Sequence, residues 1–286
     1  MNSSWFRNSV LLASWCVGVG LIYVPIVTLI AYSFFSGGGT GFSGSANLSA
    51  YRDLLKNQVM ISALGTSLQI AIICASLATV LGGLGAIAAE RAGRSRVESS
   101  RVFPISLAAK ILGGTLTVIT MLPLLLPEII FGLGLLVWFV ILRVTLGELS
   151  LILAHVTFSV SYVFMTVSAR FSLFDPSVED AAADLGAGAW QILTKVYVPM
   201  LGPALIAGWL MAFTLSFDDF LISFFTSGSD TETLPIALYN SIKFGVTPSI
   251  FAMSSLIFGV SFVTACLLAR LAVSNERRPS RASRAG

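Results

Sequence analysis

Three carboxylic side chains interrupt otherwise apolar stretches of this sequence. Glu128 lies in LLLPEIIFG, and Asp218 and Asp219 lie side by side in AFTLSFDDFLISFF. An ionised Asp at the centre of a membrane helix costs about 2.5 to 3.5 kcal/mol on insertion scales, so such residues face a cavity, a partner or water. Along a transport pathway they would attract a cationic solute, and the rings of Phe217 and Phe220 would offer it aromatic faces. The alternative is structural: the two Asp residues cap a broken helix, and the Glu compensates for backbone bonding disturbed by a neighbouring proline.

The sequence lacks the residues that enzymatic or metal-binding chemistry would need. His155 is the only histidine, so it cannot join a histidine-rich metal site, and we expect it to be a buried hydrogen-bonding residue. Cys16, Cys74 and Cys266 lie in apolar runs without a C-x-x-C pair, which indicates packing residues rather than disulfides or a zinc site. No G-x-x-x-x-G-K-[ST] phosphate loop occurs. The sequence therefore predicts no catalytic residue and no metal site.

The loop at residues 169–201 carries the densest set of helix signals. Asp175 is a good N-cap, Pro176 suits the first helical position, and Gly186 is placed to end the helix in a left-handed conformation. A narrow apolar face at helical spacing would fit a groove on another protein; it comprises Val178, Ala181, Ala182 and Leu185. A second short helix is expected to place Trp190, Leu193, Val196 and Tyr197 on one side before the chain enters the next span. An ordinary interfacial loop is the alternative.

The elements that position these residues are membrane helices. Of the 286 residues, 56% are hydrophobic and 11% are charged, which excludes a water-exposed globular surface. Apolar runs of about 20 residues or more match the hydrocarbon thickness of a bilayer. We predict an all-α, polytopic protein with a single transmembrane domain and about six helices, at 9–35, 61–89, 111–142, 149–168, 203–225 and 250–271.

The positive charges predict the orientation of these helices, because Lys and Arg concentrate on the cytoplasmic side. With six spans, 13 of the 17 Lys and Arg residues fall on the side that holds both termini and the loop at 169–201. The remaining four are Arg52, Lys56, Arg143 and Lys243. Both termini, that loop and the basic tail at 272–286 are therefore predicted to be cytoplasmic.

The same loop resembles the cytoplasmic motif of binding-protein-dependent ABC importer permeases, written EAA, three residues, Gly, nine residues, I-x-L-P. The matching positions are Asp180, Ala181, Ala182, Gly186, Val196, Val198 and Pro199, with Asp for Glu and Val for both Ile and Leu. The resemblance implies the type I importer permease fold in a bacterial inner membrane, with these residues docking on an ATPase. It also implies two ABC ATPase subunits that bind ATP-Mg, a second and homologous permease chain, and a periplasmic solute-binding protein. This chain itself would need no cofactor.

A second, less specific resemblance concerns the solute. The segments 217–220, 233–235 and 243–248 look like the polyamine branch of these permeases, which takes up spermidine and putrescine. Related permeases for iron, opines or organophosphonates share the framework and remain alternatives. An ion-coupled secondary transporter that uses the three carboxylates as a relay is a further alternative, as is a membrane-embedded enzyme. Polyamine import remains the preferred hypothesis.

Overall fold

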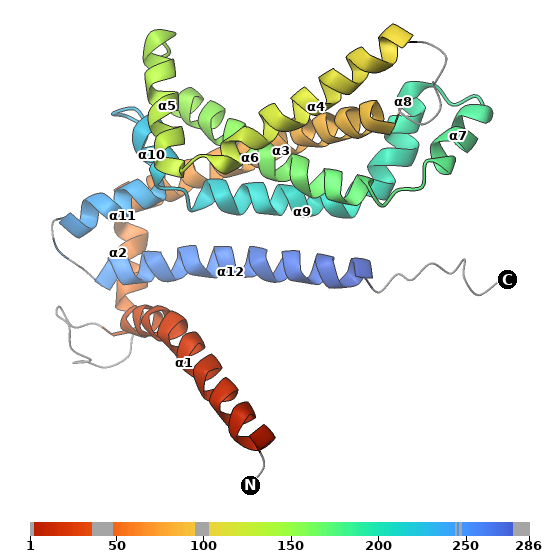
Figure 1. Ribbon diagram of the computed structural model, residues 1–286. Coiled ribbons are helices and arrows are strands. Elements are labelled where there is room, and N and C mark those ends of the chain that lie inside the picture. The colour runs from red at the N-terminus through yellow and green to blue at the C-terminus, as the bar shows by residue number, and fades with distance from the viewer. Residues whose placement is uncertain (1–2, 36–47, 95–102, 244, 246–247, 277–286) are drawn as a thin grey trace. The chain divides into compact units, whose positions relative to one another are not determined.

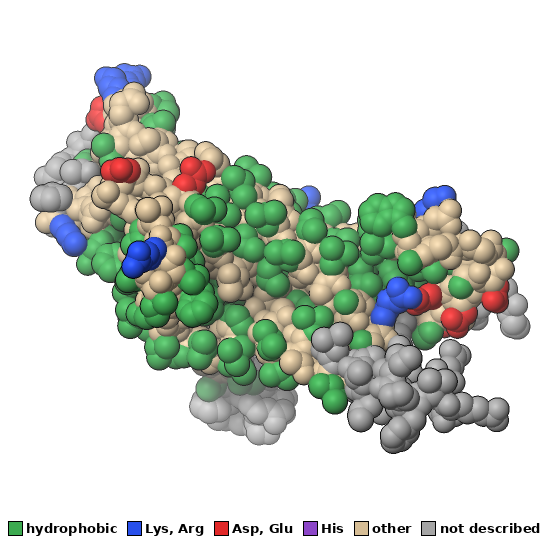
Figure 2. All heavy atoms as spheres, turned by 90° about the horizontal axis from the view of Figure 1, so that it is seen from above, with side chains coloured by type: hydrophobic (Ala, Val, Ile, Leu, Met, Phe, Trp, Pro, Cys, Tyr) green, Lys and Arg blue, Asp and Glu red, His purple; other side chains and the backbone are tan. Residues whose placement is uncertain are grey.

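The computed structural model describes residues 3–35, 48–94, 103–243, 245 and 248–276. The regular secondary structure elements in these ranges are helices (Figure 1). Five helices are long and apolar enough to cross a membrane, and a sharply bent pair would make a sixth span. The hydrophobic side chains that dominate the face seen in Figure 2 agree with a lipid environment. The chain forms two compact units, residues 1–62 with 237–260 and residues 63–236 with 261–286.

The first unit contains α1 (Ser3–Tyr32), α2 (Ser49–Lys56) and the beginning of α12 (Pro248–Glu276). The ring of Tyr32 stacks on that of Phe251, with centroids 5.5 Å apart. The hydroxyl of Tyr51, in α2, lies 2.8 Å from the Oγ atoms of both Ser33 and Ser255. These contacts join three segments that are distant in the sequence.

The second unit holds most of α3 (Gln58–Arg94), α6 (Glu148–Phe171) and α9 (Val198–Phe217), and α6 packs along α9. Small residues allow this close approach, as is common between membrane helices. A Cβ atom placed on Gly82 of α3 would lie 2.9 Å from the carbonyl oxygen of Val160 and 2.9 Å from the Cβ of Val163. A Cβ on Gly208 of α9 would lie 3.2 Å from the same valine.

The stretch at 111–142 is not one continuous helix. α4 (Phe103–Leu125) and α5 (Glu128–Ile141) are separate helices, and the chain bends by 111° between them. Pro127 has an extended ψ of 132° and no backbone N–H to donate, and it also disfavours the helical conformation of the residue before it. The predicted helix at 111–142 is therefore divided at Pro127, whereas Pro123 is accommodated inside α4.

The predicted helix at 203–225 is also divided. α9 ends at Phe217, and α10 (Leu221–Thr226) follows after a short break. At its other end, α9 continues directly from α8 (Ala189–Ile192) and a π-helix (Leu193–Tyr197), so this span starts well before 203. Short α7 (Ser177–Asp184) and α11 (Leu234–Lys243) complete the described helices. The tail beyond Glu276 lies outside the described residues.

Candidate functional site

The start of α7 has the predicted cap. The side-chain Oδ1 of Asp175 accepts a hydrogen bond from the backbone N–H of Ser177 at 3.0 Å. Pro176 between them has helical backbone angles, φ −57° and ψ −28°, and needs no N–H partner at this position. The first turn of α7 is thus fixed by signals that lie within three residues of each other.

The end of α7 is a Schellman motif. Gly186 has φ +82°, a conformation that glycine adopts without penalty. Its N–H bonds to the Ala183 carbonyl at 2.8 Å, and the N–H of Ala187 bonds to the Ala182 carbonyl at 3.0 Å. The predicted left-handed ending at this glycine is confirmed, and it sets the angle between α7 and α8.

Beyond this turn, the loop runs into α9 without a break. The N–H of Val198 bonds to the Leu193 carbonyl five residues back, which defines the π-helical turn. Pro199 follows at the beginning of α9 and has no N–H for an ordinary α-helical bond to residue 195. A displacement of α8 is therefore transmitted to α9 through continuous helical structure.

Large apolar side chains of this loop face outward. Leu185 is 90% exposed and Trp190 is 73% exposed, and Leu173 and Val178 are exposed as well. Tyr197, in contrast, is only 1% exposed, so the prediction that it shares one side with Trp190 was wrong. The π-helical turn between α8 and α9 changes the direction in which successive side chains point. Exposed Leu and Trp side chains are typical of surfaces that contact another protein or a membrane.

An ion pair that sequence analysis missed holds the inner side of α7. The Oε1 of Glu179 lies 2.6 Å from Nη2 of Arg91, near the end of α3, and its Oε2 accepts a hydrogen bond from the Tyr197 hydroxyl. The arginine also lies over the ring of Tyr197, 5.9 Å from its centroid. Because these residues are 88 and 18 positions apart, no local sequence signal pairs them.

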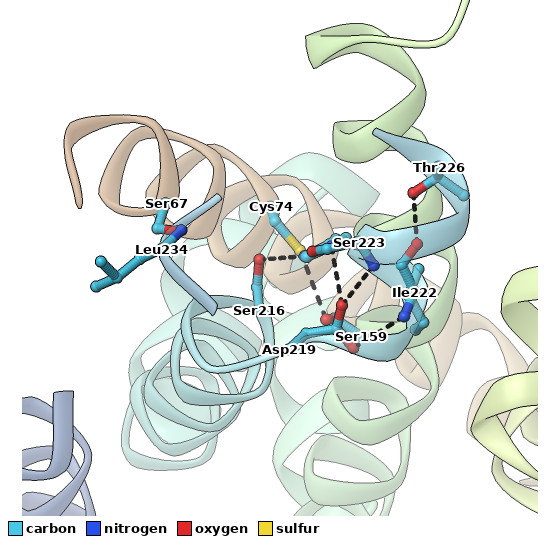
Figure 3. A network of polar contacts seen from close by, with 10 residues as sticks. Ser67, Cys74, Ser159, Ser216, Asp219, Ile222, Ser223, Thr226 and Leu234 are labelled. Atoms are coloured by element: carbon cyan, nitrogen blue, oxygen red, sulfur yellow. Dashed lines mark hydrogen bonds and ion pairs between the residues drawn. The ribbon is translucent and has the colours of Figure 1, made fainter. Parts of the chain in front are cut away.

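The second candidate region is the break between α9 and α10, which holds Asp218 and Asp219; Figure 3 shows Asp219 within its polar contacts. Asp219 is 7% exposed, and its carboxylate accepts hydrogen bonds from the backbone N–H of Ile222 at 3.3 Å and of Ser223 at 2.7 Å. A carboxylate is well suited to the unpaired N–H groups of a helical first turn. The structural alternative, that this residue caps a broken helix, is supported.

His155 of α6 links both sides of this break. Its Nδ1 lies 2.7 Å from Oγ of Ser216 in α9, and its Nε2 lies 3.0 Å from Oγ of Ser223 in α10 and 3.4 Å from Oδ2 of Asp219. The side chain is buried, which confirms the expected hydrogen-bonding role. Cys74 of α3 extends the network through a 3.5 Å contact with Ser159 (Figure 3). The thiol of Cys74 is buried and is not part of a disulfide, which agrees with a packing role.

The remaining pathway candidates differ in accessibility. Asp218 is exposed, and Glu128, the first residue of α5, is partly exposed. Phe220 is half-buried and contacts Phe224, with ring centroids 5.5 Å apart. Phe217 is 1% exposed at the end of a stack with Phe213 and Trp209. The structure thus leaves one accessible carboxyl group beside each of two helix breaks and holds Phe217 in a packed position.

Together, the apolar spans, the broken helices with carboxyl groups, and a structured loop continuous with one span define a multi-pass helical transport subunit. The family model for the binding-protein-dependent transport system inner membrane component matches residues 102–275. The chain belongs to this family of permeases.

Curated relatives agree over nearly the whole chain. The chain is 37% identical over 278 residues to the putrescine transport system permease protein PotI of Escherichia coli K12, covering 94% of each. It is 36% identical over 250 residues to the spermidine/putrescine transport system permease protein PotC of Haemophilus influenzae, covering 86% of this chain and 90% of that protein. Such coverage includes both candidate regions.

Solved structures share the fold at low sequence identity. A chain of a bacterial ABC transporter for the import of alginate matches with a TM-score of 0.66 and 15% identity, covering 98% of this chain and 99% of that one. A chain of the inward-facing methionine ABC transporter MetNI matches with a TM-score of 0.56 and 15% identity, covering 74% and 95%. These matches establish the importer permease fold.

Proposed function

We propose that this permease carries a polyamine, putrescine or spermidine, across the bacterial inner membrane, driven by ATP hydrolysis on partner subunits. The observation that carries the solute class is the pair of accessible carboxyl groups, Glu128 and Asp218, beside breaks in two apolar helices. Carboxyl groups within a membrane protein are costly unless they meet a cation, water or a polar partner. The similarity to putrescine and spermidine/putrescine permeases supports the same solute class.

A polyamine suits this region because it joins ammonium groups by apolar methylene chains. The ammonium groups would pair with the two accessible carboxylates, while the half-buried ring of Phe220 offers a face to the cation. Asp219, the buried neighbour of Asp218 in the sequence, supports the break by capping α10. In this proposal Phe217 contributes through packing, since its ring is enclosed in the aromatic stack.

The loop from Asp180 to Pro199 is the proposed docking element for the ATPase. Leu185 and Trp190 supply exposed apolar side chains, and Gly186 fixes the turn between them. ATP-Mg would be bound by two ABC ATPase subunits, since no phosphate loop occurs in this sequence. ATP-driven closure of these subunits would move α8 and, through the π-helical turn, α9.

The proposed assembly adds a second, homologous permease chain and a periplasmic solute-binding protein. The family description and the alginate transporter structure with its substrate-bound periplasmic protein support a binding-protein partner. Both termini and the docking loop would lie in the cytoplasm, as the distribution of Lys and Arg predicts. The binding protein would then deliver the solute to the opposite face.

Uptake of radiolabelled putrescine and spermidine into proteoliposomes tests the proposal, with the full complex, ATP inside and binding protein outside. We expect ATP-dependent uptake that Gly186→Arg abolishes, because the bulky cation occupies the docking turn. Asp218→Asn is expected to raise the apparent KM at least about fivefold, equivalent to about 1 kcal/mol of lost attraction. Asp53→Asn, which neutralises an exposed carboxylate of α2, is the matched control.

The alternatives give different results in the same assay. Uptake that is independent of ATP and follows an ion gradient would favour a secondary transporter. If no polyamine is imported while the ATPase still responds to the binding protein, the solute is of another class, such as iron, an opine or an organophosphonate. Neither result is expected.

A further inference from the structure

One charged side chain of α7 faces the membrane helices and not the outside of the loop. Glu179 is 19% exposed, whereas Leu185 at the end of the same segment is 90% exposed. One carboxylate oxygen of Glu179 meets Arg91 at 2.6 Å and the other accepts the hydroxyl hydrogen of Tyr197. Both oxygens are therefore engaged by groups from α3 and from the π-helix that leads into α9.

The site against which Glu179 packs is rigid. Tyr197 lies against Phe171, the last residue of α6, and Phe174, with ring centroids 5.2 and 5.7 Å apart. The rings of Phe171 and Phe174 stack on each other at 5.7 Å. Arg91 lies over the tyrosine ring as well, 5.9 Å from its centroid. A buried aromatic cluster with fixed hydrogen-bond geometry does not absorb a displacement by rotamer changes.

We infer that Arg91, Glu179 and Tyr197, together called the Glu179 junction, are the positioning residues that transmit motion of α7 to α3 and α9. This inference rests on the proposed function of the loop as the ATPase docking element. Covalent continuity already links α8 to α9, but α3 has no such link and ends 83 positions before α7 begins. The junction supplies that connection, so that α3 and α9 move together when α7 is displaced.

The ion pair between Arg91 and Glu179 makes the junction a strong contact with a defined geometry. A charge-assisted hydrogen bond to a guanidinium is shorter and stronger than a neutral one, and it resists separation in the plane of the carboxylate. The tyrosine hydroxyl donates a hydrogen bond to the second carboxylate oxygen, so the carboxylate has little freedom to turn. When Glu179 is neutral, α7 keeps its contact with the aromatic cluster but loses its ion pair with Arg91 of α3.

The test measures moles of ATP hydrolysed for each mole of polyamine imported by the full complex in proteoliposomes. The variants are Glu179→Gln, Tyr197→Phe, Arg91→Met and the charge exchange Glu179→Arg with Arg91→Glu. Asp53→Asn and Arg270→Met are controls that remove one exposed charge of each sign elsewhere. Retention of the ATPase subunits during purification is recorded for every complex.

We expect Glu179→Gln and Arg91→Met to keep the ATPase subunits and hydrolysis within about twofold of wild type. The ATP-to-solute ratio is expected to rise about tenfold, within the 5- to 150-fold range typical of coupling between sites. Tyr197→Phe should give a smaller rise in the same direction, and the charge exchange should restore the ratio to within about threefold. The controls should match wild type.

Three results would overturn the inference. Single variants that couple as well as wild type would show that α3 needs no tie to α7. Loss of the ATPase subunits from Glu179→Gln would assign this residue to docking. A charge exchange no better than the worse single variant would exclude the ion pair as the active contact. A wild-type complex without ATP-dependent uptake would instead refute the proposed function itself, so the two failures are distinguishable.

Discussion

The conformation of Gly186 allows the shape of the docking loop to be separated from its surface. The residue has φ +82°, and a Cβ atom added there meets no atom within 4 Å. The cost of a side chain in the permease alone is therefore purely conformational. For an L-residue other than Asn or Asp, a left-handed backbone costs about 1 to 2 kcal/mol.

Three substitutions at Gly186 separate the effect of backbone conformation from the effect of side-chain volume. Gly186→Ala adds one methyl group but carries the conformational cost, so the turn is populated about 5- to 30-fold less and affinity for the ATPase subunit falls accordingly. Gly186→Val should be worse, since β-branched residues rarely adopt positive φ. Gly186→Asn adds more bulk than alanine but tolerates this conformation, and we expect binding within about threefold of wild type.

The assay is titration of the nanodisc-embedded permease pair with fluorescently labelled ATPase subunit, read as anisotropy. The order of affinity Gly, Asn, Ala, Val is the expected result. An order that follows side-chain volume, with alanine equal to wild type and asparagine much weaker, would refute the argument. It would mean that the partner subunit contacts this position closely and that backbone strain plays no part.

Three further predictions concern the packing of the second unit, and thermal unfolding of the purified complex in detergent measures all of them. His155→Ala removes the partner of Ser216, Ser223 and Asp219 at once and should destabilise the chain by about 1 to 3 kcal/mol; a melting temperature equal to wild type would contradict the network. Gly82→Ala brings a methyl group within 2.9 Å of the Val160 carbonyl oxygen and should cost about 1 to 3 kcal/mol, whereas Gly134→Ala, with no atom within 4 Å, should be neutral or stabilising. Ser67→Ala leaves the buried N–H of Leu234 without its 2.8 Å acceptor, at about 1 to 3 kcal/mol, while Thr157→Val, which loses only a bond to its own helix, is the control that should change little.

Local signals in the sequence predicted local structure well. The cap at Asp175 and the left-handed turn at Gly186 depend on backbone groups within a few residues, so residue type and spacing were sufficient. Helical spans followed from hydrophobic length in the same way. The break at Pro127 is encoded locally as well, but the length of the apolar run does not distinguish one span from two bent halves.

Contacts between distant segments could not be predicted in this way. His155 meets Asp219 across 64 positions and Arg91 meets Glu179 across 88, and their proximity follows only from how α3, α6 and α9 pack. The sequence accordingly left the role of Asp219 open between pathway and cap. Once the helices are placed, its two backbone hydrogen bonds support the cap and leave Asp218 as the accessible carboxylate.

The π-helical segment Leu193–Tyr197 also sets the rotational phase of α9. A turn closed by bonds to the fifth residue holds one residue more than an α-helical turn, so every side chain of α9 lies about 100° less far around the axis than an uninterrupted α-helix from Ala189 would place it. Rewinding this segment as an α-helix at unchanged sequence would turn the α6-facing side of α9 away from its partner without changing a single side chain in the span. Any chimaera that exchanges docking loops between permeases must therefore join them after Tyr197 and not before Leu193.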